Sequence, residues 1–349
     1  MKQHEISPEV ITDLIQFLSP NVHHNLRQQA LDYIIGLSAS DQFNVIFQAN
    51  DFLLGQSLCQ LICEDNANGN DILPTLINAT ATDVICVKYV ISNMELIQRL
   101  IEYCRVGDEQ RSLNAGKILS NLSLHFPDRL YDVLVKEWDD FIADIIKRLN
   151  DSVFYDSTKY LGYVLINLTS IASIRCLLCQ KFVQQMLPLM DYNKRPERCL
   201  IVIDILRNMC FENSCHSVLL DENDELLSTL LKPLADVSDN LDDGEIEKLP
   251  IQLQYYEGHR CQDSLITNKI IESLYQVSIF LVPKLWIVHG GREYLSVFCD
   301  ILLSSSLGML LLHRYYLLVL CAVLTLNDRA KAKTTMPVIL TFSIDKLFN

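Results

Sequence analysis

Glycine and proline are scarce in this chain. Its 349 residues include only 11 Gly and 10 Pro, whereas average usage would give about 24 Gly and about 17 Pro. β-Sandwiches and barrels use these residues at their many tight turns. The scarcity therefore argues against such folds and favours a chain built mainly of helices.

Basic residues are also few relative to acidic ones. The chain has 29 Lys and Arg against 43 Asp and Glu, which gives a formal net charge of −14. Nucleic-acid binding needs clustered Lys and Arg to neutralise phosphates, and the basic clusters here are short, such as Lys194-Arg195. We expect no direct nucleic-acid contact, and a basic protein or peptide partner suits the charge better.

The common catalytic motifs are missing as well. The sequence contains no Gly-rich phosphate loop, no G-x-S-x-G and no H-E-x-x-H, which position the reactive groups of many enzymes. We therefore predict no enzymatic activity, no catalytic residues and no cofactor. The first residues, MKQHEISPEV, lack the apolar core of a secretory signal, so we expect a cytoplasmic protein.

Cysteine, by contrast, is plentiful, with 12 residues. In a reducing compartment Cys behaves as a small buried hydrophobe. Two pairs and one cluster are close in sequence: Cys59 with Cys63, Cys176 with Cys179, and Cys210 with Cys215 and His216. A structural zinc site needs four ligands, and no second C-x-x-C or H-x₃₋₅-H supplies them. We predict buried thiols and no metal site.

The main positive feature is a repeat in which Asn follows an aliphatic run. LINATA, ILSNLS, VLINLTS and ILRNMC place this residue at Asn78, Asn121, Asn167 and Asn208. The successive intervals of 43, 46 and 41 residues match the HEAT and armadillo periods of about 40 to 47 residues. Fainter copies put Gly36 and Ser273 in register, the last after 65 residues. We call these six positions the register marks, and the longer last interval predicts an insert.

Within each unit the apolar spacing is helical. In LNAGKILSNLSLHF, apolar residues recur every three to five positions, whereas Asn114, Lys117 and Asn121 fall on another face. Helices of this kind cannot bury their apolar faces alone and must stack on neighbouring units. The sequence therefore predicts an all-α, armadillo/HEAT-type α-solenoid of about six helical repeats.

The repeated Asn residues have two possible roles. On the last helix of an armadillo unit they would line the concave surface, where their amides can donate to and accept from an extended peptide backbone. Alternatively, each side chain caps or braces the turn to the next helix. The candidate protein-binding residues are Asn78, Asn121, Asn167 and Asn208. Three of them begin Asn-x-Ser/Thr glycosylation triplets, which we interpret as a by-product of the repeat.

One armadillo class is disfavoured. Receptors similar to importin-alpha place a Trp four residues before the Asn, where it stacks on basic side chains of the cargo. The corresponding residues here are Pro74, Lys117, Tyr163 and Asp204. Recognition of nuclear-import cargo in that manner is therefore not expected.

Three linked motifs indicate a family. The chain reads LRNMCFE, then LLKPLA, then EIEKLPIQLQY, and QFLSP occurs early at 16–20. This pattern resembles the HGH-one homologue family, also called brain protein sixteen, from about Ile11 to Leu295. The resemblance implies an armadillo-like cytosolic adaptor without enzymatic activity. It also implies two partners, eukaryotic translation elongation factor 2, whose folding such proteins assist, and the cytosolic chaperonin.

The resemblance ends near Leu295. We predict an armadillo-like domain over 1–295, with an acidic insert at about 236–262, and a divergent apolar segment over 296–349. Leu307 to Leu326 is long enough to span a bilayer, but Arg314 near its middle opposes insertion. We therefore predict no membrane segment, while 296–349 is compatible with a further repeat, a membrane segment or an aberrant C-terminus. Two alternative functions stay open: a general armadillo peptide-binding scaffold for signalling or transport, and a membrane-tethered adaptor.

Overall fold

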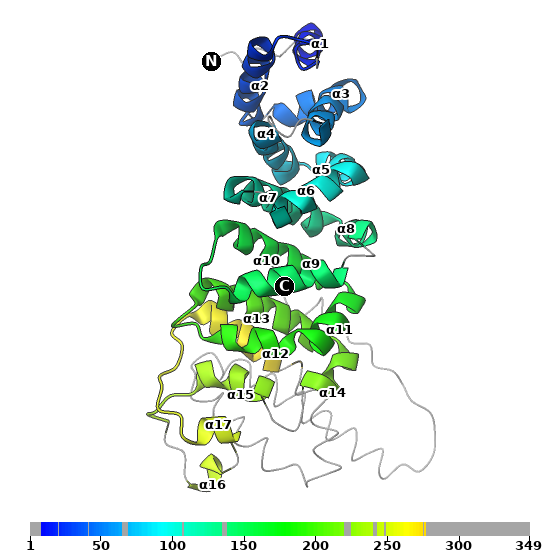
Figure 1. The fold of residues 1–349 in the computed structure, drawn as a ribbon. Helices are drawn as coiled ribbons and strands as arrows, with labels where there is room; N and C mark the ends of the chain where they lie inside the picture. Colours follow the sequence, from blue (N-terminus) through cyan, green and yellow to red (C-terminus); the bar gives the residue numbers. More distant parts are fainter. Residues whose placement is uncertain are drawn as a thin grey trace, which may run out of the picture. The chain divides into compact units, whose positions relative to one another are not determined.

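The computed structural model describes residues 8–19, 21–40, 42–64, 69–106, 108–134, 138–219, 225–239, 243–247, 249–274 and 276. Helices and no strands occur in these residues. They run in the order α1 (Pro8–Phe17), α2 (His24–Ser38), α3 (Phe43–Glu64), α4 (Gly69–Thr82), α5 (Val84–Ile91), α6 (Met94–Val106), α7 (Glu109–His125), α8 (Pro127–Leu134), α9 (Trp138–Asn150), α10 (Asp156–Leu168), α11 (Ala172–Lys181), α12 (Val183–Met186), η1 (Leu187–Met190), α13 (Pro196–Cys210), η2 (Asn213–Cys215), α14 (His216–Leu219), α15 (Glu225–Leu231), η3 (Lys232–Leu234), α16 (Asp243–Ile246) and α17 (Ile251–Gln254) (Figure 1). Residues 264–274 form a further helix.

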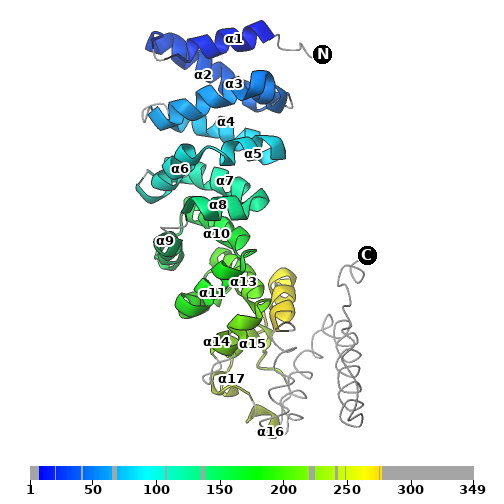
Figure 2. The ribbon, with the colours of Figure 1, turned by 90° about the vertical axis from the view of Figure 1, so that its right-hand side faces the viewer.

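The helices from α1 to α13 stack in chain order (Figure 2). Each of the six register marks lies on a separate helix: α2, α4, α7, α10, α13 and the helix at 264–274. Along this series α2 packs on α4, α4 on α7, α7 on α10 and α10 on α13. The predicted all-α solenoid of about six repeats is therefore confirmed, and the repeated sequence marks the helix through which successive repeats pack.

Helix α9 shows why these segments fold as they do. Its buried residues recur at three- and four-residue steps: Trp138, Phe141, Ile142, Ile145, Ile146 and Leu149. Asp139 and Asp140 lie in its first turn, and Lys147 and Arg148 lie in its last. Acidic side chains at the N-terminus and basic side chains at the C-terminus interact favourably with the helix dipole. One apolar stripe thus enters the core, while the termini carry the charges that stabilise them.

The predicted polar face of α7 needs a correction. The periodicity places Asn114 with Lys117 and Asn121 on a face other than the apolar one, but the Asn114 side chain is buried. Its Oδ1 accepts a hydrogen bond of 3.2 Å from Gln110 Nε2. The reason is that α7 packs against α4, α6 and α10, so neighbours cover it on more than one side. Periodicity within one helix does not reveal how many neighbours surround it.

Two glycines allow the repeats to approach closely. Gly116 and Gly162 lie five residues before Asn121 and Asn167, on α7 and α10. A Cβ atom added at Gly162 would lie 2.8 Å from Cδ1 and 2.9 Å from Cγ2 of Ile201 on α13. At Gly116 it would lie 3.3 Å from Cβ of Tyr160 on α10. The packing of α10 on α13 therefore depends on the missing side chain at Gly162.

Helix α3 contains a break that the sequence pattern did not indicate. Asn50, Asp51 and Phe52 adopt positive φ angles of 51°, 54° and 64°. Asn and Asp tolerate this conformation, whereas Phe rarely adopts it. The ring of Phe52 stacks on Tyr89 of α5, with centroids 4.2 Å apart. Contact with the next helical layer thus offsets part of the local strain.

The described residues divide into two compact units. The first contains those up to Pro233 and again those from His259, and the second contains those from Leu234 to Gly258. In the second unit, Val237 N–H donates to Gly258 O at 2.9 Å and joins the two ends of the segment. The predicted insert at about 236–262 overlaps this unit, and the predicted domain limits stay a prediction.

The predicted divergent segment 296–349, including Leu307 to Leu326, lies outside the described residues. Within the described ranges, no single helix has both the length and the apolar character needed to cross a membrane. Helices α10 and α11 meet those criteria only when taken together across a bend of 119°.

Candidate functional site

The four Asn residues of the repeat connect the equivalent helices of successive repeats by one recurring hydrogen bond. In every case the side-chain amide nitrogen donates to a hydroxyl oxygen of the preceding repeat. The bonds run from Asn78 to Ser38 at 2.8 Å, from Asn121 to Thr80 at 3.1 Å, from Asn167 to Ser123 at 3.0 Å and from Asn208 to Thr169 at 2.7 Å. We call this series the Asn–hydroxyl ladder. It links α2, α4, α7, α10 and α13.

The acceptors of the ladder explain the glycosylation-like triplets. Each acceptor lies two residues after a register mark, so Asn-x-Ser/Thr supplies the donor to one neighbour and the acceptor to the next. Thr80 and Ser123 are buried, and their hydroxyls also donate to Leu76 O at 2.7 Å and Ser120 O at 3.0 Å. Because a buried hydroxyl needs partners, the triplet is a requirement of packing between repeats.

The structure shows bracing, but not of the kind anticipated. The Asn amides brace the preceding repeat across the helix interface, whereas the bracing alternative placed their contacts at the turn to the following helix. Each Asn is half-buried. Within the described residues, the side-chain hydrogen bonds of Asn78, Asn121, Asn167 and Asn208 use the amide nitrogen Nδ2, and none uses Oδ1. The predicted role in protein binding stays a prediction, and Oδ1 is the side-chain atom left to accept a further hydrogen bond.

The ladder stops where the insert begins. Cys210, two residues after Asn208, replaces the hydroxyl residue, and the next register mark is the buried Ser273, whose hydroxyl donates to Lys269 O at 2.8 Å. Two ion pairs connect α13 to the helix at 264–274 instead. They join Lys269 Nζ to Asp204 Oδ2 at 2.6 Å, and Arg207 to Glu272.

These ion pairs keep the register of the repeat. Asp204 and Lys269 each lie four residues before their register marks, and Arg207 and Glu272 each lie one residue before them. The lysine and aspartate side chains are 21% and 25% exposed, so water screens this pair less than a fully exposed one. Polar contacts between equivalent positions therefore continue past the insert with different chemistry.

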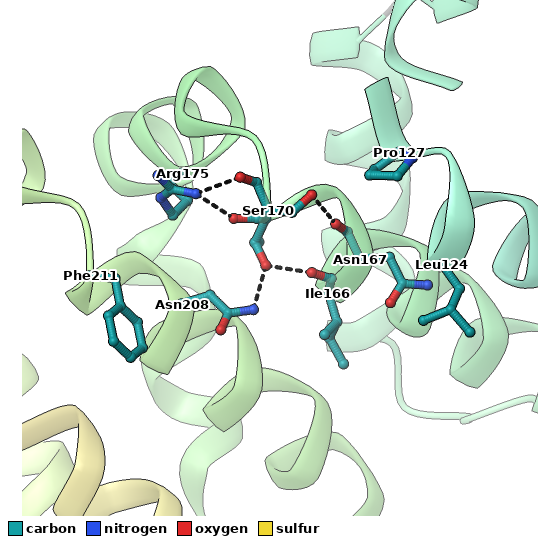
Figure 3. A pocket seen from close by; sticks show the side chains of 9 residues that line it. Leu124, Pro127, Ile166, Asn167, Ser170, Arg175, Asn208 and Phe211 are labelled. Carbon is teal, nitrogen blue, oxygen red and sulfur yellow. Dashed lines mark hydrogen bonds between the residues drawn. The ribbon is translucent and has the colours of Figure 1, made fainter. Parts of the chain in front are cut away.

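A cavity of about 450 Å³ opens beside the last two Asn residues of the ladder. Both apolar and polar side chains line it, and we call it the Asn167–Asn208 pocket. Its lining residues are Leu124, Pro127, Ile166, Asn167, Thr169, Ser170, Arg175, Asn208 and Phe211. Figure 3 shows the two Asn side chains between Leu124 and Phe211. The pocket lies entirely within the first unit.

Arg175 holds one side of this pocket in place. Its Nη1 donates to the carbonyl oxygens of Thr169 and Ser170, at 2.8 Å each (Figure 3). Its Nη2 donates to Glu212 Oε2 at 2.9 Å. The carbonyls belong to the end of α10, where cations are favoured. The hydrogen bond from Arg175 holds the pKa of Glu212 below its ordinary value. The guanidinium charge is therefore already paired, and the polar side of the pocket is preorganised.

The structure buries Cys59, Cys179, Cys210 and Cys215 and leaves Cys63 and Cys176 half-buried. Among the residues that the structure describes, no three His, Cys, Asp or Glu side chains are grouped to hold a metal ion. Burial raises the pKa of the Cys59, Cys104, Cys199 and Cys210 thiols from 9.0 to about 12.

These pKa shifts predict a loss of stability at alkaline pH. Between pH 9 and pH 12 the unfolded chain releases thiol protons that the folded chain keeps, so the free energy of unfolding falls as the pH rises. The stability linked to these protonated thiols is therefore fully present below pH 9 and is lost as the pH approaches 12. Urea midpoints measured at pH 7.5 and pH 10.5 should show the decrease. The difference between the two midpoints should be smaller in the Cys104→Ala/Cys210→Ala variant. If the difference is unchanged, groups other than these thiols cause the pH dependence of stability.

The same burial predicts which thiols react. Iodoacetamide attacks the thiolate, so Cys104 and Cys210 should stay unmodified at pH 8, whereas the half-buried Cys63 and Cys176 should be labelled before them. Tryptic mass spectrometry of the labelled native protein gives the order directly.

The chain is similar to one described family and to several known proteins. Residues 62–268 match the model of a domain of unknown function (DUF383). The protein HGH1 homologue of Drosophila pseudoobscura pseudoobscura is 29% identical over 287 residues, covering 77% of each chain. The HGH1 homologue of Danio rerio is 29% identical over 77% of this chain and 73% of the relative. The human HGH1 homologue is 27% identical over 77% and 72%, respectively.

Solved structures support the fold. A computationally designed armadillo repeat protein for modular peptide recognition superposes with a TM-score of 0.56 at 13% identity, covering 76% of this chain and 99% of that one. A second designed armadillo repeat protein, in complex with the peptide (KR)4, gives a TM-score of 0.55 at 14% identity over 76% and 99%. At such identities the likeness concerns the fold alone.

Proposed function

Because this chain belongs to the DUF383 family and to the HGH1 homologues, we propose that it is a non-enzymatic adaptor that assists the folding of another protein. The client is eukaryotic translation elongation factor 2, and the adaptor works together with the cytosolic chaperonin in the cytoplasm. The choice of these two partners rests on the family resemblance of LRNMCFE, LLKPLA and EIEKLPIQLQY.

The observation that carries a binding role is the ladder face, by which we mean the side of α4, α7, α10 and α13 that presents Asn78, Asn121, Asn167 and Asn208. Along it, amide oxygens without a hydrogen bond in the described residues recur once per repeat. A partly folded client exposes unpaired backbone N–H groups and apolar side chains. A row of evenly spaced acceptors on a preformed surface can bind such a segment without a deep enclosed site.

The charge of the chain is compatible with this role. The formal net charge of −14 repels acidic chains and favours encounter with basic regions of a client, which affects the association rate more than the final affinity. The binding itself then depends on the hydrogen bonds and apolar contacts of the ladder face.

Affinity capture tests this function. The full chain carrying a tag should recover elongation factor 2 and chaperonin subunits from eukaryotic cytosol, and the tag alone should not. In a second measurement with purified elongation factor 2, factor diluted from denaturant should bind at least tenfold more tightly than native factor, because only the former exposes extended segments. Recovery of other proteins without elongation factor 2 would contradict the proposal and favour a general peptide-binding scaffold.

A further inference from the structure

The Asn167–Asn208 pocket has the features of a subsite for one side chain of a bound polypeptide. Its volume of about 450 Å³ is ample for a large side chain with part of its backbone. Its walls come from the ends of α7, α10 and α13 and the residues after α10 and α13, together with Pro127 at the start of α8 and Arg175 on α11. Since Arg175 ties the end of α10 to Glu212, the pocket is formed without a ligand.

The hydrogen-bonding groups of the pocket offer acceptors. Asn208 donates its amide nitrogen to Thr169, and Asn167 donates its own to Ser123 and Ser120 O. Both Oδ1 atoms are left to accept, and Figure 3 shows the Asn208 oxygen turned away from its bond to Thr169. Two acceptors on adjacent repeats match the N–H groups of an extended backbone, which have no partner within a single strand.

The charges of the pocket are already balanced. Arg175 pairs with Glu212 at 2.9 Å. Next to the pocket, Arg207 pairs with Glu272 and lies over the ring of Phe211, 5.6 Å from its centroid. A Lys or Asp side chain that entered would lose hydration without gaining a free counterion, which is unfavourable. The pocket therefore selects for a neutral side chain.

The apolar walls indicate which neutral side chain. Leu124 is 63% exposed and Phe211 is 47% exposed, and they face the pocket from either side of the Asn pair (Figure 3). Large exposed apolar groups beside acceptors are typical of binding sites, and aromatic and aliphatic anchors dominate the affinity of such sites. An aliphatic or aromatic residue that entered the pocket would bury apolar surface of one of these walls.

We propose that the Asn167–Asn208 pocket binds one neutral aliphatic or aromatic side chain of an extended client segment, whose backbone N–H groups donate to Oδ1 of Asn167 and Asn208. This inference rests on the proposed function in one respect, namely that the segment belongs to the folding client. It adds a location and a side-chain preference to that function.

Twelve-residue peptides test the preference. In a Gly-Ser sequence of twelve residues with Leu, Phe, Lys or Asp near the centre, the Leu and Phe peptides should bind the full chain at least tenfold more tightly than the Lys and Asp peptides, as measured by fluorescence anisotropy. N-methylation of the two amides that flank the Leu should weaken binding about tenfold. Equal binding of the Lys and Leu peptides, or no binding of the Leu and Phe peptides, would overturn the proposal.

Paired variants test the location. Leu124→Ala/Phe211→Ala should weaken binding of the Leu peptide, and binding of elongation factor 2, at least tenfold. The matched control, Val106→Ala/Val153→Ala, truncates side chains that are 82% and 52% exposed and lie outside the pocket lining. It should change neither of the two binding affinities. Circular dichroism and thermal melting check that both variants stay folded.

The two proposals fail in different ways. If wild type captures elongation factor 2 and the pocket variant does so equally well, the pocket assignment is wrong and the proposed function stands. If wild type prefers the Leu peptide through Leu124 and Phe211 but does not capture elongation factor 2, the pocket stands and the client is wrong.

Discussion

Gly162→Ala should lower the free energy of unfolding by about 1–3 kcal/mol, the usual range for an overpacked core, although alanine is the better helix former. The new methyl group would lie 2.8 Å from Cδ1 and 2.9 Å from Cγ2 of Ile201. Ile201 is 1% exposed, and its β-branched side chain has restricted rotamers in a helix. The α10–α13 interface must therefore open, which also moves Asn208 relative to Thr169.

Gly36→Ala is the matched control for this substitution. Gly36 also lies within a helix, α2, but no atom lies within 4 Å of its added Cβ. Here alanine should raise the free energy of unfolding by about 0.4–1 kcal/mol, since it restricts the unfolded chain without a clash. Urea titrations followed by circular dichroism give both values.

A double-mutant cycle identifies the cause. If the clash with Ile201 is responsible, Ile201→Ala should remove most of the additional effect of Gly162→Ala, although Ile201→Ala is destabilising by itself. Additive effects of the two substitutions would show that the cost at Gly162 arises elsewhere.

Asn121→Ala/Asn167→Ala should weaken binding of partly folded elongation factor 2 at least tenfold and lower the free energy of unfolding by about 1–3 kcal/mol. The stability loss follows mainly from the two inter-repeat hydrogen bonds to hydroxyls, each contributing about 0.5–1.5 kcal/mol net. The longer bonds from the same amides to the carbonyl oxygens of Ile77 and Ser120 are lost with them. The binding loss follows from removal of two amide oxygens of the ladder face. Both quantities are measured on the same purified variant, by urea titration and by titration with the client.

A second pair of substitutions separates bracing from binding. Thr80→Val/Ser123→Ala removes the two buried acceptors of the same hydrogen bonds and leaves both Asn side chains present. This variant should lose a similar amount of stability but bind the client within about twofold of wild type. If both variants lose binding in proportion to their unfolded fraction, the ladder serves packing alone and the binding role is wrong.

Much of the fold followed from spacing along the chain. A period of 41 to 46 residues between Asn78, Asn121, Asn167 and Asn208 was sufficient to predict stacked helical repeats, because a repeat that cannot bury its apolar stripe alone must pack on its neighbours. The displaced mark at Ser273 likewise predicted an interruption, and the structure shows that the ladder ends there. The burial of Asn114 was missed, because it depends on neighbours that periodicity does not describe.

The site was predictable only in part. The four Asn residues were identified by their place in the repeat. Their hydroxyl partners were not: three of the four belong to the glycosylation-like triplets, and Ser38 follows Gly36. The Asn167–Asn208 pocket was not anticipated, although the +3 positions after Asn121 and Asn208 are Leu124 and Phe211. Those two exposed residues in register were the available signal.

The sequence by itself determined the helical class, the length of the repeat and the positions that recur, because these depend on local spacing and on the need to bury one face of each helix. The tertiary structure alone decided what those positions do. Each ladder bond joins residues 39 to 44 positions apart, so it forms only where the helices approach closely, as Gly116 and Gly162 allow. That approach uses the side-chain amide nitrogens and leaves the side-chain oxygens without a hydrogen bond in the described residues. Spacing along one chain cannot specify this division of roles.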